Sequence, residues 1–189
     1  MKSQWLLVAV FFPLEILSQE NSTRLHLHTI VSVGMARGES TVKPLVQIES
    51  GIFRQRWFGG AGIGIDLYNL KSIPLFLAGR LHLGKRRQLF VYGNGGYNFP
   101  VGNKSNFVDA WQSTNRFYGG FYMDAGLGYR VRVNSLHHII VSAGFSEKNV
   151  VNKVRYKYFF PGSPSQEIID KYDYKMRRVV ARLSWDFGK

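Results

Sequence analysis

The sequence alternates between apolar and polar or small residues from Arg24 onward, and this period of two constrains the fold more than any other feature. In the segment 25–36, one set of alternate residues is largely apolar and the other is small and mixed. Successive side chains of a β-strand point to opposite faces, so such a pattern predicts a strand with two unlike faces.

Seven further segments alternate in the same way and bring the number of predicted strands to eight. They are 45–53, 57–68, 74–83, 89–99, 117–133, 138–147 and 174–187. Most are near the roughly 9–11 residues that a tilted strand needs to cross a hydrocarbon layer, whereas strands of soluble proteins average roughly 5–6. After residue 18 no segment is apolar for long enough to form a membrane helix, so a membrane location would require a barrel.

The links between the predicted strands differ in length in a regular way. Residues 54–56, 84–87 and 134–135 form short turns, whereas the polar segments 100–116 and 148–173 are long. Up-and-down barrels of the outer membrane have tight periplasmic turns and longer external loops. The sequence therefore predicts an all-β fold, an eight-stranded antiparallel up-and-down transmembrane β-barrel, formed by residues 19–189.

The first 18 residues have the features of a secretory signal peptide. Lys2 supplies a basic start, residues 5–17 are largely apolar, and Ser18 is a small residue at a position suited to cleavage. Pro13 and Glu15 interrupt the apolar run, which leaves a buried N-terminal helix as the alternative. A signal peptide predicts export, and with the barrel it predicts the bacterial outer membrane as the location.

The two faces of the predicted strands distinguish a membrane barrel from a soluble one. The predicted outer face carries no charge over segments such as 63–67, 139–145 and 179–187, while the inner face carries acids, arginines and glycines. A soluble lipid-binding barrel has its apolar face inside, so it is the less favoured alternative. Aromatic residues near the strand ends are expected at headgroup depth, where they would contact outer-membrane lipid.

The net charge and the composition limit the classes of partner that the protein could bind. The chain has 25 Lys and Arg against 12 Asp and Glu, and it has no cysteine. A net charge of +13 suits nucleic acid, anionic lipid or acidic polysaccharide, but an export signal disfavours nucleic acid. The absence of cysteine excludes a disulfide scaffold.

Five stretches of the sequence together resemble the small outer-membrane β-barrel proteins of OmpA, OmpX and PorT type, including uncharacterised members. They are WFGGAGIGIDLYN (57–69), SIPLFLAGRLHLG (72–84), FVYGNGGYNF (90–99), GGFYMDAGLGYR (119–130) and ARLSWDFGK (181–189). The resemblance implies a strand architecture and carries no catalytic signature. The aromatic residues Trp185 and Phe187 also resemble the end signal that the barrel-assembly machinery reads, which implies that machinery as a partner during biogenesis.

Eight charged residues on the predicted inner face form the main candidate site. They are Glu49, Asp66, Arg80, Asp124, Arg130, Arg178, Arg182 and Asp186. Unpaired charges in a narrow interior are costly, so we expect the four acids to pair with the four arginines. The interior of an eight-stranded barrel is just wide enough for side chains to fill it. A plugged lumen is therefore predicted, with a small or gated pore as the alternative.

Histidines and serines are weaker candidates. His26, His28, His82 and His138 are expected to face inward near the periplasmic end, where packing is favoured over metal binding. Ser142 and Ser146 share the inner face of one strand, with no histidine expected beside them. We therefore predict no catalytic residue, no enzyme activity, no metal and no cofactor.

Aromatic and basic residues are interleaved in the predicted external loops. The aromatic candidates for binding an external glycan or protein are Phe107, Trp111, Tyr156, Tyr158, Phe159 and Phe160. Loops on a rigid scaffold are common recognition sites, but strands that extend past the membrane would explain the same residues. The sequence thus predicts a structural or interaction protein that acts through its external loops.

Overall fold

The structure is a computed structural model that describes residues 26–39, 41–101, 104–105, 113–134, 136–158 and 166–188. The predicted signal peptide, residues 1–18, lies outside these residues. Among the residues described, no helix is long and apolar enough to span a membrane.

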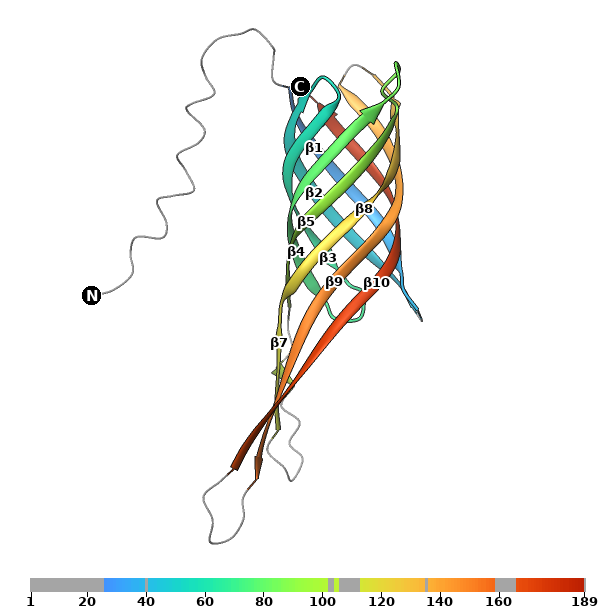
Figure 1. Cartoon of the computed structure of the whole chain (residues 1–189). Coiled ribbons are helices and arrows are strands. Elements are labelled where there is room, and N and C mark those ends of the chain that lie inside the picture. The colour runs from blue at the N-terminus through green and yellow to red at the C-terminus, as the bar shows by residue number, and fades with distance from the viewer. Residues whose placement is uncertain are drawn as a thin grey trace, which may run out of the picture.

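All regular structure in the described residues is β-strand, and the strands belong to one sheet (Figure 1). They are β1 (His26–Arg37), β2 (Val42–Arg54), β3 (Trp57–Asp66), β4 (Ser72–Leu83), β5 (Leu89–Pro100), β6 (Lys104–Ser105), β7 (Ser113–Tyr118), β8 (Gly120–Arg132), β9 (His137–Tyr158) and β10 (Gln166–Gly188).

Eight of these strands close into a ring. Each strand pairs antiparallel with the next in the order β1, β2, β3, β4, β5, β8, β9, β10. The ring closes because β10 pairs back onto β1, from His28 opposite Gly188 to Arg37 opposite Val179. The predicted eight-stranded antiparallel up-and-down barrel is confirmed.

The two ends of the barrel differ. At one end, here called the turn end, short links join β2 to β3, β4 to β5 and β8 to β9. Gln55 and Arg87 adopt positive φ angles of 55° and 52° in the first two of these links, as does Gly84 at 72°. The left-handed conformation lets the chain reverse within a few residues.

The opposite end carries a sheet that leaves the barrel (Figure 1). Beyond the residues that pair with β8, β9 continues through residues 149–158, which pair with residues 175–166 of β10. β7 extends this pairing on the other side of β9, and β6 pairs with β7. We call these parts, residues 104–105, 113–118, 149–158 and 166–175, the external sheet.

The external sheet corrects one prediction from the sequence. Residues 148–173 were expected to form a long polar loop, but much of this segment is strand in β9 and β10. The structure agrees with the alternative in that the last two strands continue past the barrel. A strand surrounded by water needs no apolar outer face. The segment is therefore polar, and its strands could not be recognised from apolar alternation.

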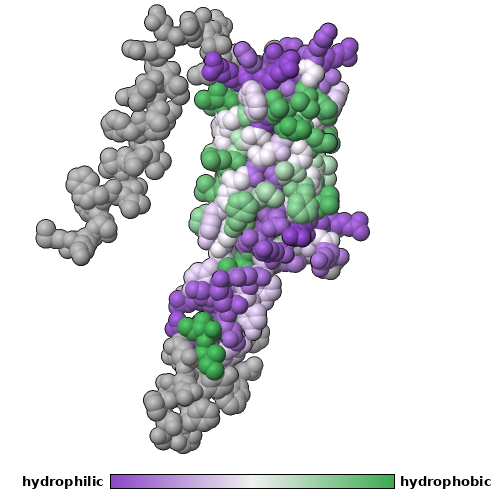
Figure 2. Space-filling view, viewed as in Figure 1, coloured by the Kyte–Doolittle hydropathy of each residue, from purple (hydrophilic) through white to green (hydrophobic). Residues whose placement is uncertain are grey.

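Burial alternates along each barrel strand, so one face is exposed and the other packed. Leu77 on β4 is 72% exposed, for example, whereas its neighbour Phe76 is 2% exposed. Figure 2 shows the exposed apolar side chains as a band around the middle of the barrel, with polar side chains at both rims. This is the surface that a barrel in a lipid bilayer presents.

The barrel interior is more aromatic than the sequence pattern indicated. A buried cluster occupies part of the lumen among the polar residues, and it contains Ile30, Phe58, Phe76, Ala78, Phe90, Tyr92, Tyr122 and Ile140. The inner face therefore combines charges with large rings, rather than with glycines alone.

Candidate functional site

The eight predicted inward charges form four ion pairs across the lumen. Arg80 on β4 pairs with Glu49 on β2, and Arg182 on β10 pairs with Asp124 on β8. Two further pairs join Arg178 of β10 to Asp66 of β3, and Arg130 of β8 to Asp186 of β10, the latter at 2.8 Å. Each of the four acids thus meets one of the four arginines. None of these side chains is more than 12% exposed.

Tyrosine hydroxyls complete the hydrogen bonding of Asp124. Tyr92 and Tyr122 each donate to this carboxylate at 3.3 Å. The hydroxyl of Tyr92 also accepts from Arg182 at 3.1 Å, and that of Tyr122 accepts from Gln47 at 2.9 Å. A charge that is paired and also hydrogen-bonded is much less costly to bury than a bare one.

Lys148 belongs to the same network, although the sequence analysis placed it in a loop. It lies on β9 with a fully buried side chain, and its Nζ is 3.3 Å from the Asp66 carboxylate. The ammonium donates to the backbone oxygens of Tyr68 and Leu70, at 2.8 and 2.9 Å, and to the hydroxyl of Ser72 at 3.2 Å. Lys148 therefore fastens the link between β3 and β4 to the barrel wall. Its place on the inner face, two residues after Ser146, was the signal available in the sequence.

Histidines gather around Asp186 at the turn end. His28 Nδ1 lies 2.8 Å from one carboxylate oxygen of Asp186, and His138 Nδ1 lies 3.7 Å from the other. His82 donates through Nδ1 to the backbone oxygen of Arg87 at 2.9 Å. His26 begins β1, but its side chain lies outside the described part of the structure. Among the described residues no group of three or more His, Asp or Glu side chains is placed to hold a metal ion.

Two of the cavities in the lumen lie among the ion pairs and rings, and each has a volume of about 10 Å³. One is next to Arg80, His82 and Phe58, and the other is next to Arg182, Tyr92 and Ser142. A cavity of this size holds about one water molecule.

The two inward serines lie within the charge network. Ser142 and Ser146 are both buried on β9, and Ser146 accepts a hydrogen bond from Arg178 at 3.3 Å. His28, His82 and His138 lie toward the turn end, so the described residues bring no histidine into contact with either serine.

The structure describes only part of the predicted aromatic binding set. Tyr156 and Tyr158 lie in the external sheet on β9, although the side chain of Tyr158 is outside the described residues. Phe107, Trp111, Phe159 and Phe160 also lie outside them. Four other exposed residues of this sheet were not predicted from the sequence, namely Ile168, Ile169, Tyr172 and Tyr174.

Comparison with known proteins supports the fold but does not identify a family. No protein-family model matches the sequence, and no curated protein matches it. The membership in an OmpA-, OmpX- or PorT-like family that the sequence suggested is therefore not confirmed.

Solved structures of membrane barrels do match. The chain is similar to the crystal structure of the outer membrane protein OprG from Pseudomonas aeruginosa, with a TM-score of 0.55 and 11% identity over 87% of this chain and 95% of that one. It also matches the outer membrane protein AlkL, solved by solid-state NMR in DMPC lipid bilayers, with a TM-score of 0.49 and 8% identity over 87% and 90% of the two chains. The likeness to OprG shows that this chain has the fold of a small outer-membrane β-barrel.

Proposed function

We propose that this protein is a non-enzymatic outer-membrane β-barrel with a closed lumen, which holds its external sheet at the bacterial surface to bind an acidic glycan. One observation carries the proposal: β9 and β10 remain paired for ten residues beyond the barrel, through 149–158. These strands have 22 and 23 residues, about twice the roughly 9–11 residues that crossing the membrane requires.

A paired sheet offers a partner a surface that is already ordered. Fixing the backbone of a residue costs about 1–2 kcal/mol of conformational entropy. The strands of the external sheet are already ordered in the folded protein, so binding does not have to supply this free energy. The external sheet differs in this respect from flexible external loops, whose ordering would weaken binding.

The residues of the external sheet suit an acidic glycan. Lys153 Nζ lies 4.8 Å from the ring centre of Tyr118, and Lys171 lies opposite Lys153 on the same face of the sheet. Tyr172 and Tyr174 are exposed on the other face. The sheet carries seven Lys and Arg against three Asp and Glu, a net charge of +4. Exposed rings provide flat faces for sugars, and the cations attract carboxylates or phosphates.

A shortened variant tests the proposal. Asn149 and Lys175 are paired across β9 and β10, so replacing residues 150–174 with Asn-Gly should form a two-residue hairpin turn. The deleted segment contains Tyr172 and Tyr174, and its charges are four cations and three acids, so the net charge falls by only one. The change in gel mobility on heating, which is typical of folded barrels, would show that the shortened protein still folds.

The readout is binding of polygalacturonate to both proteins in non-ionic detergent, with neutral dextran as the control polysaccharide. We expect saturable binding by the full chain and a loss of about tenfold or more in the shortened variant, equivalent to about 1.4 kcal/mol. Equal binding by the two proteins would contradict the proposal, because the shortened variant lacks Lys153, Lys171 and the two exposed tyrosines while its net charge is only one lower.

A further inference from the structure

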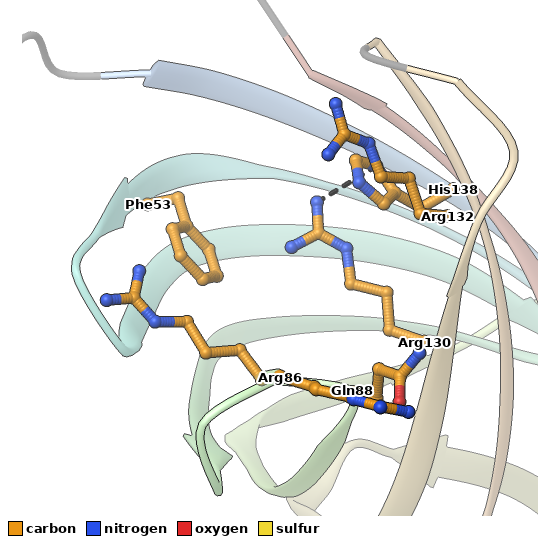
Figure 3. Close-up of a pocket in the computed structure, with 7 residues that line it drawn as sticks. Phe53, Arg86, Gln88, Arg130, Arg132 and His138 are labelled. Atoms are coloured by element: carbon orange, nitrogen blue, oxygen red, sulfur yellow. Dashed lines mark hydrogen bonds between the residues drawn. The ribbon is translucent and has the colours of Figure 1, made fainter.

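A basic pocket opens at the turn end of the barrel, opposite the external sheet. Its volume is about 450 Å³, which is within the roughly 300–1,000 Å³ that is usual for small-molecule sites. Figure 3 shows side chains from β2, β8, β9 and the link between β4 and β5 around it. The lining residues are Phe53, Arg86, Arg87, Gln88, Arg130, Arg132 and His138.

Four arginines and no carboxylate line this pocket. Within the described part of the chain, Arg86, Arg87 and Arg132 form no ion pair. Arg87 donates to the backbone oxygen of Gln55 at 2.9 Å, and Arg132 Nε donates to that of Asn134 at 3.2 Å. These bonds fix the positions of two guanidinium groups without neutralising them.

The inner end of the pocket is a pre-ordered set of donors. Arg130 donates to Asp186 at 2.8 Å and to His138 Nδ1 at 3.0 Å, the bond drawn in Figure 3. Because Nδ1 accepts, the proton of a neutral His138 is on Nε2, which leaves that nitrogen as a donor. The Arg130 guanidinium lies 5.3 Å from the ring centre of Phe53, and its Nε is buried without a hydrogen-bond partner.

Among the residues described, the only carboxylate close to this donor set is that of Asp186, and it already has partners. Asp186 accepts from Arg130 and also contacts His28 and His138, so it has no capacity to neutralise the other three arginines. The pocket therefore keeps an excess of positive charge on a partly enclosed surface. Such an arrangement concentrates an anion.

We propose that the turn-end pocket binds the phosphate group of an ester, with the rest of the ligand lying against Phe53. Arginine forks donate paired hydrogen bonds to phosphate oxygens, and several arginines match a group with more than one charged oxygen. The volume leaves room for the organic part that carries the phosphate. Two sources present this chemistry: a soluble phosphate monoester and the headgroup of an anionic phospholipid.

Two double variants distinguish binding in the pocket from attraction by the overall positive charge at the turn end. Arg86→Gln with Arg132→Gln removes two cations from the lining. Arg54→Gln with Arg56→Gln removes two exposed cations from the neighbouring turn, which does not line the pocket. All four side chains lie outside the lumen ion pairs, and gel mobility with and without heating checks that each variant folds.

Two probes distinguish the sources of the phosphate. Calorimetric titration with glycerol 3-phosphate, with glycerol as the phosphate-free control, measures binding of a soluble ester. Native mass spectrometry of protein incubated with phosphatidylglycerol measures how much of a headgroup-bearing lipid is retained. We expect the wild-type protein to bind at least one probe saturably, the pocket variant to bind that probe about tenfold more weakly or worse, and the turn variant to stay within about threefold of wild type.

Comparing the binding of the two probes shows which source of phosphate the pocket accepts. Specific binding of glycerol 3-phosphate supports a soluble ester, and specific retention of phosphatidylglycerol alone supports a lipid headgroup. Failure to bind either probe would overturn the inference, as would equal losses in the two variants, which would show that only net charge matters. The test is independent of the glycan proposal, because the external sheet is unchanged in every variant.

Discussion

At the scale of single residues, glycines in the barrel wall make room for the rings that fill the lumen. A Cβ at Gly62 would lie 2.6 Å from the ring of Phe76, and a Cβ at Gly128 would lie 2.7 Å from ring atoms of Phe90. A Cβ at Gly126 would come within 2.8 Å of the Tyr92 hydroxyl and still closer to the backbone oxygen of Ala143. Real Cβ atoms do not approach other atoms so closely, so these positions accept no larger residue unless a ring or, at Gly126, the neighbouring strand moves.

Gly128→Ala should therefore destabilise the barrel. Phe90 is 1% exposed and the cavity that it lines is only about 10 Å³, so the added methyl group overpacks the interior. The expected loss in the free energy of unfolding is about 1–3 kcal/mol, measured by denaturant titration in lipid vesicles. Gly93→Ala is the matched control, because a Cβ at Gly93 meets nothing within 4 Å and should leave the unfolding free energy nearly unchanged. Equal losses would show that glycine matters here for backbone reasons.

At the scale of elements, β10 carries the largest share of the charge network. Arg178, Arg182 and Asp186 follow one another at intervals of four residues on its inner face. They pair with residues of β3, β8 and, through His28, β1. One strand thus connects β3 and β8 across the lumen by ion pairs, in addition to its backbone pairing with β9 and β1.

The pair between β10 and β8 can be tested by a double-mutant cycle. Arg182→Leu leaves Asp124 buried without its cation, which is expected to cost about 3–5 kcal/mol of unfolding free energy. Adding Asp124→Leu removes the stranded charge, so the double variant should recover much of that loss. Thermal unfolding followed by gel mobility compares Arg182→Leu, Asp124→Leu alone and the double variant with the wild-type protein. Additive losses would mean that the two side chains do not interact.

The strands of the barrel and the inward charges could be predicted from the sequence because both follow from a period of two. Arg80, Asp124 and Arg182 fall on the inner face by simple alternation. Their exact partners could not be predicted, since they depend on how far each strand is shifted against its neighbours. Lys148 and the external sheet were missed for another reason: outside the hydrocarbon, a strand loses the apolar face by which it is recognised.

At the scale of the whole molecule, we expect the barrel to be closed by its own side chains. Ion pairs and aromatic rings occupy the lumen, and two cavities among them are about 10 Å³ each. The alternative, a pore, needs a continuous water path, whereas a cavity of this size holds about one water molecule.

Single-channel recording in planar bilayers tests this closure. We expect no steady conductance from the inserted wild-type protein, and leak after combining Arg80→Ala with Arg182→Ala, because both substitutions empty space in the lumen and leave Glu49 and Asp124 unpaired. Protection of the barrel strands from protease would show insertion independently. Steady channels in the wild-type protein would instead support the pore.

Because Arg178, Arg182 and Asp186 all lie on β10, the charge network of the lumen cannot be completed until this strand is made. Among the strands described, β10 comes last in the order of synthesis, and it brings the arginine partners of Asp66 and Asp124, of which Asp66 also contacts Lys148 of β9. Until it arrives, the half-made sheet holds carboxylates that hydrocarbon does not tolerate. Entry into the bilayer should therefore await delivery of this strand, so that a chain truncated before it stays in the aqueous compartment as a substrate for chaperones and proteases.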